Sequence, residues 1–276
     1  MLYAFVVTLR EGLEAALILG ILLAYLQKLG RREGARPIWA GTLAALAVSL
    51  LGGLLLHGLA GELSGKLLDL FEGLTMLVAV AILSYMILWM QRQARHLQVE
   101  LHQRVDQALA AGSRVALAVV AFTVVGREGI ETALFLVAGS LKSESGLFYA
   151  LAGIAGAVIA VLLGYLLYQG TVRLNLRVFF TVTGVLLIVF AAGLLSNGLK
   201  ELQEVGAVPT LIPHVWDTYD LLQDNTEAGR LLAALFGYDA SPSLLQVLTY
   251  VAYLASFLTY YLQDIIGRPR RAPSLA

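Results

Sequence analysis

The sequence predicts an all-α polytopic membrane protein with seven transmembrane helices: a 3+3 inverted repeat plus one additional helix. Three observations predict this fold. The 276 residues are 59% hydrophobic and 14% charged, with a mean hydropathy of +0.78, whereas soluble domains carry about 25% charged residues. Apolar stretches long enough to cross a bilayer recur along the chain. A short charged motif occurs twice, on stretches that would run in opposite directions.

Each expected span is a run of about 20 or more mainly apolar residues. The first has no basic segment before it and continues past signal-peptide length, so we expect it to remain as a membrane helix. Between the third and fourth spans, residues 92–114 are too charged to cross and are patterned as an amphipathic helix on the membrane surface. The spans are expected at 2–27, 38–60, 67–91, 115–139, 147–169, 178–199 and 244–264.

Basic residues predict the orientation, because Lys and Arg accumulate on the cytoplasmic side of a membrane. Thirteen of them follow the first, third, fifth and seventh spans, and only four follow the other spans. We therefore expect the N-terminus outside, the C-terminus in the cytoplasm, and a multi-pass location in the cytoplasmic (inner) membrane. The expected organisation is a single membrane domain, 1–264, comprising repeat one (2–91), the connector (92–114), repeat two (115–199), an acidic extracytoplasmic loop (200–243) and the seventh helix (244–264), followed by a basic cytoplasmic tail (265–276).

A twelve-residue segment of the first span recurs in the fourth. LREGLEAALILG at residues 9–20 aligns without gaps to GREGIETALFLV at residues 126–137, with seven of the twelve positions identical. The first copy would run inward and the second outward. A motif repeated on antiparallel spans three helices apart predicts an inverted repeat, and proteins of that kind hold their substrates near the bilayer midplane.

Each copy of the motif carries one arginine and two glutamates. At about 100° per residue, Arg10, Glu11 and Glu14 share one face of a helix, and the two carboxylates are close enough to bind one ion together. The excess charge is negative, which predicts a cation site. The candidate metal ligands are Glu11, Glu14, Glu128 and Glu131, and the charge-balancing or gating residues are Arg10 and Arg127.

A structural explanation of the motif is an ion pair between each arginine and the glutamate four residues later. Each ionised residue costs about 2.5–3.5 kcal/mol at the centre of a membrane helix, and such a pair would offset much of that. Glu11 and Glu128 would still be left as one surplus carboxylate per helix. The surplus favours a binding function over a structural one.

The third span adds two acidic residues near its outer end. Glu72 is expected at the mouth of the site or within it as a further metal ligand, and Asp69 is either a ligand or a headgroup-level residue. In the same span, the segment SYMILWM at residues 84–90 is expected to pack or to lie at the membrane interface. The 200–243 loop has a net charge of about minus five, which would either concentrate cations at an entrance or simply be solvated. Candidate entrance residues there are Asp217, Asp220 and His214.

Composition excludes several classes of function. The chain has no cysteine and four histidines, so a metal site must rest mainly on oxygen ligands. A formal net charge of zero gives no reason to expect a nucleic-acid partner. No histidine lies in the interior of a span, which argues against a di-metal enzyme built on Glu-x-x-His pairs. No catalytic residue and no permanently bound cofactor is expected.

Two REGxE motifs, on the first and fourth of seven spans, closely resemble the oxidase-dependent iron transporter family, the high-affinity iron permeases, and within it the bacterial Efe-type permeases. FEGLTMLVAVAILSYMILWM also resembles the third helix of that family. The resemblance implies that the four motif glutamates form an iron pathway and that Glu72 matches an acidic position of the third helix. It also implies an extracytoplasmic partner that binds or oxidises iron.

The expected function is therefore the carriage of iron into the cell as a substrate, past Glu72 and between the first and fourth spans. Hard carboxylate oxygens favour Fe³⁺, with Fe²⁺ as the other candidate. Because the same ligands suit other divalent ions, a permease for a Mn²⁺-like cation or a proton-coupled cation transporter remains the alternative.

Overall fold

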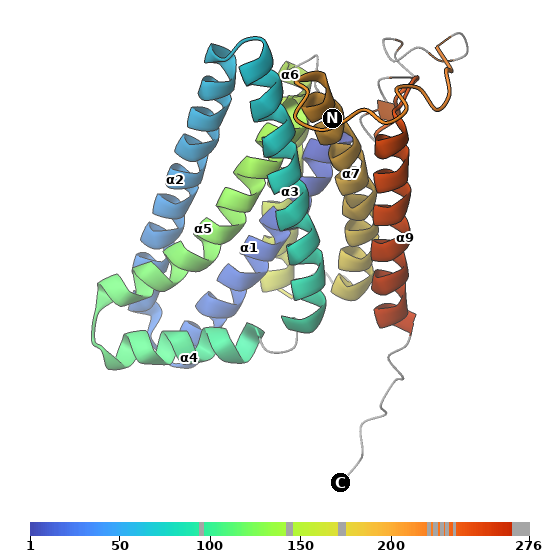
Figure 1. The fold of residues 1–276 in the computed structure, drawn as a ribbon. Coiled ribbons are helices and arrows are strands. Elements are labelled where there is room, and N and C mark those ends of the chain that lie inside the picture. The colour runs from blue at the N-terminus through green and yellow to red at the C-terminus, as the bar shows by residue number, and fades with distance from the viewer. Residues whose placement is uncertain are drawn as a thin grey trace.

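The computed structural model describes residues 1–93, 97–141, 146–170, 175–219, 222, 226, 229, 232–233 and 236–266 (Figure 1). Within these residues the chain is helical and contains no β-strand. In the described part of the chain, seven long helices pack side by side, and a shorter one, α4, lies across one end of the bundle. The elements are α1 (Leu2–Lys28), η1 (Arg32–Gly34), α2 (Ala35–Glu62), α3 (Lys66–Gln93), α4 (Leu97–Ala110), α5 (Arg114–Ser140), α6 (Gly146–Tyr168), α7 (Leu176–Glu204) and α9 (Leu244–Ile266).

The seven long helices coincide with the seven expected apolar ranges to within a few residues. Five of them, α2, α3, α6, α7 and α9, are long and apolar enough to cross a membrane. The other two, α1 and α5, are each 27 residues long, about 40 Å at 1.5 Å per residue. Each carries the three charged residues of one motif in its otherwise apolar sequence.

The short helix α4 covers the ends of α1 and α5 that lie farthest from residues 205–219 and 236–243 (Figure 1). The side chains of Leu101 and Val105 are buried there in a cluster that also contains Leu22, Ile38 and Leu117. The expected amphipathic pattern is therefore present, but α4 turns its apolar face to the other helices. We call this the α4 end of the bundle, and the opposite end, which carries residues 205–219 and 236–243, the loop end.

Three pairs of long helices that are neighbours in the sequence, α1–α2, α2–α3 and α5–α6, barely touch. Instead, α1 packs mainly against α6, α2 against α5, and α3 against α7, while α1 and α5 cross in the middle. The three helices before α4 are thus interleaved with the three that follow it. On the outside of this arrangement, α9 packs against α7.

Close helix contacts recur in matched pairs. A β-carbon at Gly12 would come within 2.8 Å of the Ala160 Cβ, and one at Gly129 within 2.8 Å of the Ser49 Cβ. Gly129 follows Gly12 by 117 positions, and Ala160 follows Ser49 by 111. Two further matches are Ala16–Gly164 with Ala133–Gly53, at the same offsets, and Gly73–Leu202 with Gly198–Leu77, at an offset of 125.

Two buried apolar clusters fill the bundle. One includes Tyr3, Phe135 and Leu187 and extends along α3, α7 and α9 to Met86 and Tyr261, whereas the other includes Leu22 and Ile38 and lies beneath α4. The motif residues lie between these two clusters along α1 and α5. The charged layer is therefore enclosed by hydrocarbon on both sides.

The described parts of the loop fold back on the helices. Helix α7 continues to Glu204, so the loop starts later than expected. Backbone hydrogen bonds from Val215 N to Pro242 O (3.0 Å) and from Thr218 N to Ala240 O (2.9 Å) join its two ends. The loop is thus a packed cap on this end of the bundle in the part that is described.

Candidate metal-binding site

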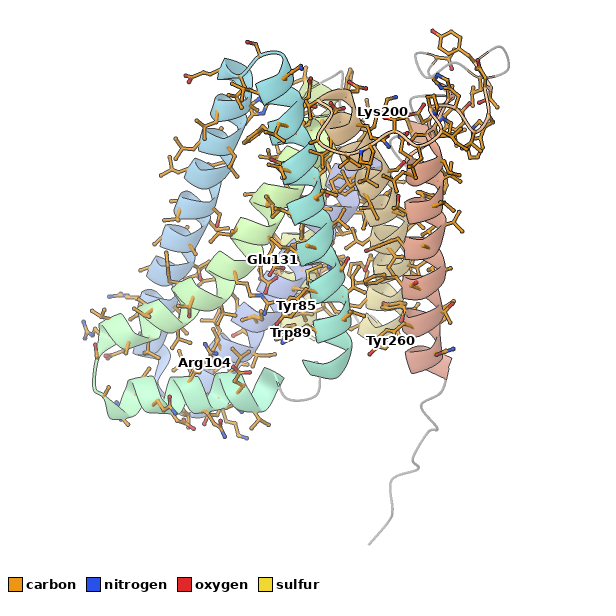
Figure 2. The ribbon with its side chains drawn as sticks, in the orientation of Figure 1. Tyr85, Trp89, Arg104, Glu131, Lys200 and Tyr260 are labelled. Atoms are coloured by element: carbon orange, nitrogen blue, oxygen red, sulfur yellow. The ribbon has the colours of Figure 1, made fainter. Side chains whose placement is uncertain are left out.

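The two motif helices cross so that their charged faces meet. The side chain of Glu11 is fully buried and that of Glu14 is 12% exposed, while Glu131, from the antiparallel helix, is 13% exposed. Glu128 is also buried. In Figure 2, Glu131 lies in the middle of the bundle, beside α3. All four candidate ligands therefore lie inside the protein.

Three of the four glutamates converge on one point. One carboxylate oxygen each from Glu11, Glu128 and Glu131 lies within 4.8 Å of the other two. Oxygens that share a small cation at about 2.1 Å can be at most about 4.2 Å apart. Side-chain movements of a few tenths of an ångström would therefore allow all three to bind one ion.

The arginines contact the same carboxylates. Arg10 Nη1 lies 2.9 Å from Glu11 Oε1, and its Nη2 lies 3.2 Å from Glu14 Oε1. Arg127 Nε lies 2.9 Å from Glu131 Oε1. If all four glutamates were ionised, they and the two arginines would give the site a formal charge of minus two.

Several buried carboxylate oxygens lack a donor. Among the described residues, Glu11 Oε2, Glu128 Oε2 and Glu131 Oε2 have no hydrogen-bond partner, and Glu14 Oε1 has only its ionic contact with Arg10. Buried acceptors are normally satisfied, and an unsatisfied one costs about 1–3 kcal/mol. The arginines therefore leave lone pairs that a bound cation would use.

Helix α3 forms a third wall of the site. Arg10 Nη1 donates to Met86 Sδ at 3.3 Å, and the guanidinium carbon of Arg127 lies 4.1 Å from the ring centre of Trp89 (Figure 2 labels Trp89 near Glu131). The sequence predicted that this segment packs or lies at the membrane interface, and did not predict its contacts with the arginines. The usable signal was that Met86 and Trp89, three residues apart, share one helical face.

The acidic residues of α3 lie outside this cluster. Glu72 and Asp69 are half-buried, and Glu72 precedes Met86 by fourteen residues, about 21 Å along the helix. The three-carboxylate group found among the described residues contains neither of them. Glu72 is thus positioned toward the loop end rather than within the site.

The proposed entrance residues are separated from the site as well. His214 and Asp217 are exposed; His214 Nδ1 lies 3.4 Å from Ser241 O, and Asp217 Oδ1 accepts from Tyr219 N at 3.0 Å. Asp220 lies outside the described residues. The described loop residues do not bring His214 and Asp217 to a shared contact.

Long apolar helices that enclose a buried cluster of acidic side chains are typical of membrane proteins that carry cations. The chain matches the Iron permease FTR1 family over residues 1–266 and belongs to that family. It is accordingly a transporter and not an enzyme.

Similar proteins match along almost their whole length. The ferrous iron permeases EfeU of Escherichia coli O157:H7 and Shigella sonnei are each 35% identical over 263 residues, which cover 95% of both chains. The ferrous iron permease EfeU of Yersinia pestis is 34% identical over 263 residues, covering 95% of this chain and 93% of its own. No solved structure matches this chain.

Proposed function

We propose that this protein carries iron across the cytoplasmic membrane into the cell, and that the two REGxE motifs form the site through which it passes. Family membership supports iron as the substrate. The observation that carries the site assignment is the convergence of Glu11, Glu128 and Glu131, whose spare oxygens are buried without a donor. Glu14, held by Arg10, would join when the ion arrives.

The proposed architecture is an inverted repeat of two halves, 2–91 and 115–199, with α1 and α5 among its membrane-spanning helices. The matched contacts described above support it, because a single pair of offsets relates the α1–α6 interface to the α5–α2 interface. The loop end is proposed to face the outside, as the distribution of basic residues predicts. Relative movement of the halves would then expose the site to either side.

In this proposal iron reaches the site from the loop end. Glu72, on the loop-end part of α3, would receive the ion before it moves inward. The roles of Asp69, His214, Asp217 and Asp220 remain predictions of the same kind, at or near the outer surface. The arginines would reduce repulsion among the four carboxylates while the site is empty.

Different observations favour Fe³⁺ and Fe²⁺ as the transported ion. Hard carboxylate ligands favour Fe³⁺, the expectation from the sequence. A site charge of minus two would be neutralised by Fe²⁺, and the similar proteins are named ferrous iron permeases. Uptake measured with iron held reduced by ascorbate, against uptake from a ferric citrate complex, distinguishes the two.

The decisive experiment is uptake of radiolabelled iron by transport-deficient cells that express the wild type, Glu11→Gln or Glu128→Gln at equal membrane levels. Glu100→Gln is the matched control, because Glu100 is an exposed glutamate of α4 paired with Arg104. We expect uptake to collapse in the two site variants and to persist in the control. Equal uptake by all four proteins would refute the site assignment.

The main alternative, a permease for another divalent cation, makes a different prediction in the same cells. If the site is tuned to iron, a tenfold excess of Mn²⁺ or Ca²⁺ should leave iron uptake nearly unchanged. Strong competition by Mn²⁺, together with Mn²⁺ uptake that Glu11→Gln abolishes, would favour the alternative.

A further inference from the structure

A buried tyrosine near the start of α1 has a polar atom without a partner. Tyr3 is 5% exposed, and its hydroxyl has no hydrogen-bond partner among the described residues. The ring is held edge-on against Phe190, with centroids 5.3 Å apart. A phenylalanine would make the same apolar contacts, so packing alone does not account for the hydroxyl.

A second buried tyrosine, Tyr149, lies beside Tyr3, and both contact Gly139. Tyr149 of α6 is also buried, and its hydroxyl donates to Leu136 O at 3.0 Å. A β-carbon at Gly139 of α5 would collide with both the Tyr149 hydroxyl and the Tyr3 ring. The two phenol side chains therefore meet at a point where α5 has no side chain of its own.

This point lies on the loop-end side of the glutamates. Tyr3 precedes Glu11 by eight residues on α1, and Gly139 follows Glu131 by eight on α5. Because these helices run in opposite directions, both intervals lead toward the loop end, by about 12 Å each. The tyrosines are therefore placed between the outer surface and the three-carboxylate cluster.

The matching positions in the other half are purely apolar. With the offsets that relate the helix contacts, Tyr3 corresponds to Val120, Gly139 to Leu22, and Tyr149 to Ile38. Leu22 and Ile38 are fully buried in the cluster beneath α4, and Val120 packs against it. Hydrocarbon thus suffices for packing at this position of the repeat, and of these matched positions only those toward the loop end carry hydroxyl groups.

We infer that the hydroxyl oxygens of Tyr3 and Tyr149 form a transient binding step for an iron cation on its way from the loop end to the glutamates. The inference rests on the proposed function. A phenol oxygen can accept from water or coordinate a cation through its lone pairs. Replacing part of the hydration shell in this way is how oxygen-lined pathways admit ions.

The test compares initial rates of radiolabelled iron uptake, at iron concentrations below saturation, for Tyr3→Phe, Tyr149→Phe and Tyr253→Phe. Tyr253 is the control, since its hydroxyl pairs with Ser84 at 2.8 Å, where α9 meets α3. We expect Tyr3→Phe to lower the rate roughly tenfold, the loss for one contact to a charged partner. Tyr149→Phe should lower it less, and Tyr253→Phe should match the wild type.

Binding to purified protein provides a second readout. In Glu128→Gln, where onward transfer is blocked, we expect radiolabelled iron to bind weakly, and the added Tyr3→Phe change should abolish that binding. Suppose that Tyr3→Phe takes up iron at the wild-type rate, while Glu128→Gln abolishes uptake in the same cells. This result would overturn the tyrosine step and leave the proposed function intact. Wild-type uptake by Glu128→Gln would overturn both.

Discussion

Arg10 and Arg127 occupy equivalent positions in the two motifs but different surroundings. Arg10 is 2% exposed and contacts both glutamates of its own helix, whereas Arg127 is 34% exposed and contacts one glutamate and the face of Trp89. A buried guanidinium that loses its carboxylates is strongly unfavourable. Arg127 is the more solvent-exposed of the two, so we expect it to release its glutamate more readily than Arg10 does.

Residue spacing was enough to predict which charged side chains face one another. It could not predict that Glu11, Glu128 and Glu131 converge while Glu14 lies outside that group. That choice depends on how α1 is rotated against α5, which is determined by contacts with α2 and α6. The same rotation brings Met86 and Trp89 to the arginines. The pattern of residues along one helix therefore could not predict these contacts either.

A first prediction concerns Trp89. Trp89→Leu removes the aromatic face beneath Arg127, a cation–π contact of about 0.5–2 kcal/mol. We expect lower thermal stability of the purified protein and slower iron uptake, with Trp89→Phe intermediate in both. Tyr85→Leu is the control, because Tyr85 is 63% exposed on the same helix. Equal effects of the Trp89 and Tyr85 changes would contradict a specific role of the ring.

At the scale of the helices, glycines set how closely the two halves approach. At Gly41, a β-carbon would collide with the backbone of Ala118, and at Gly129 it would collide with the Ser49 side chain. The Ala118 backbone cannot move aside, whereas the Ser49 side chain can be removed by substitution. The α2–α5 interface therefore offers a direct test of the close packing.

A second prediction follows for Gly129→Ala. Overpacking of this kind costs about 1–3 kcal/mol, so we expect a lower unfolding temperature and reduced uptake. Gly129→Ala combined with Ser49→Gly should recover most of both. Gly58→Ala, where nothing lies within 4 Å, should be neutral or slightly stabilising. Failure of the double variant to recover would show that the loss has another origin.

A third prediction concerns the cap at the loop end. Lys200 Nζ lies 2.7 Å from Asp239 Oδ2. Burial raises the pKa of Asp239, but the Lys200 hydrogen bond and charge, with the Ser241 N–H and the Gln246 amide, hold that pKa below its usual value. Because the folded pKa is the lower one, the contribution of this carboxylate is present above the unfolded pKa of about 3.9 and lost as pH falls.

We therefore expect Asp239→Asn to lower the unfolding temperature near neutral pH, with the difference from the wild type shrinking below about pH 4. Limited proteolysis within residues 205–243 should accelerate in parallel. Thermal unfolding of both purified proteins across this pH range is the measurement. A difference that stays constant with pH would exclude the carboxylate charge as its cause.

At the scale of the whole molecule, hydropathy and the repeated motif predicted the all-helical architecture and the helix ranges closely. They did not predict the interleaving of the halves, because the pairing of α1 with α6 and of α2 with α5 depends on small residues far apart in the sequence. They predicted an amphipathic helix at α4 but not that its apolar face packs against α1, α2 and α5, since an amphipathic pattern does not distinguish lipid from other helices as the partner of that face.

A fourth prediction tests the orientation, which the absence of cysteine makes straightforward. Ser64 and Ala207 are exposed at the loop end, and Ala111 is exposed at the α4 end. In intact cells, a membrane-impermeant maleimide should label Ser64→Cys and Ala207→Cys. It should label Ala111→Cys only after permeabilisation. The opposite pattern would reverse the proposed direction of the bundle.

The interleaved packing also constrains how the protein is made. Helix α1 is synthesised well before its main partner, α6, which begins only at Gly146. Until more than half of the chain has been synthesised, the buried charges of the first motif lack the carboxylates and close-packed glycines of the other half. Neither half can complete its interfaces alone, so we expect the native contacts to form late, after the second half has inserted.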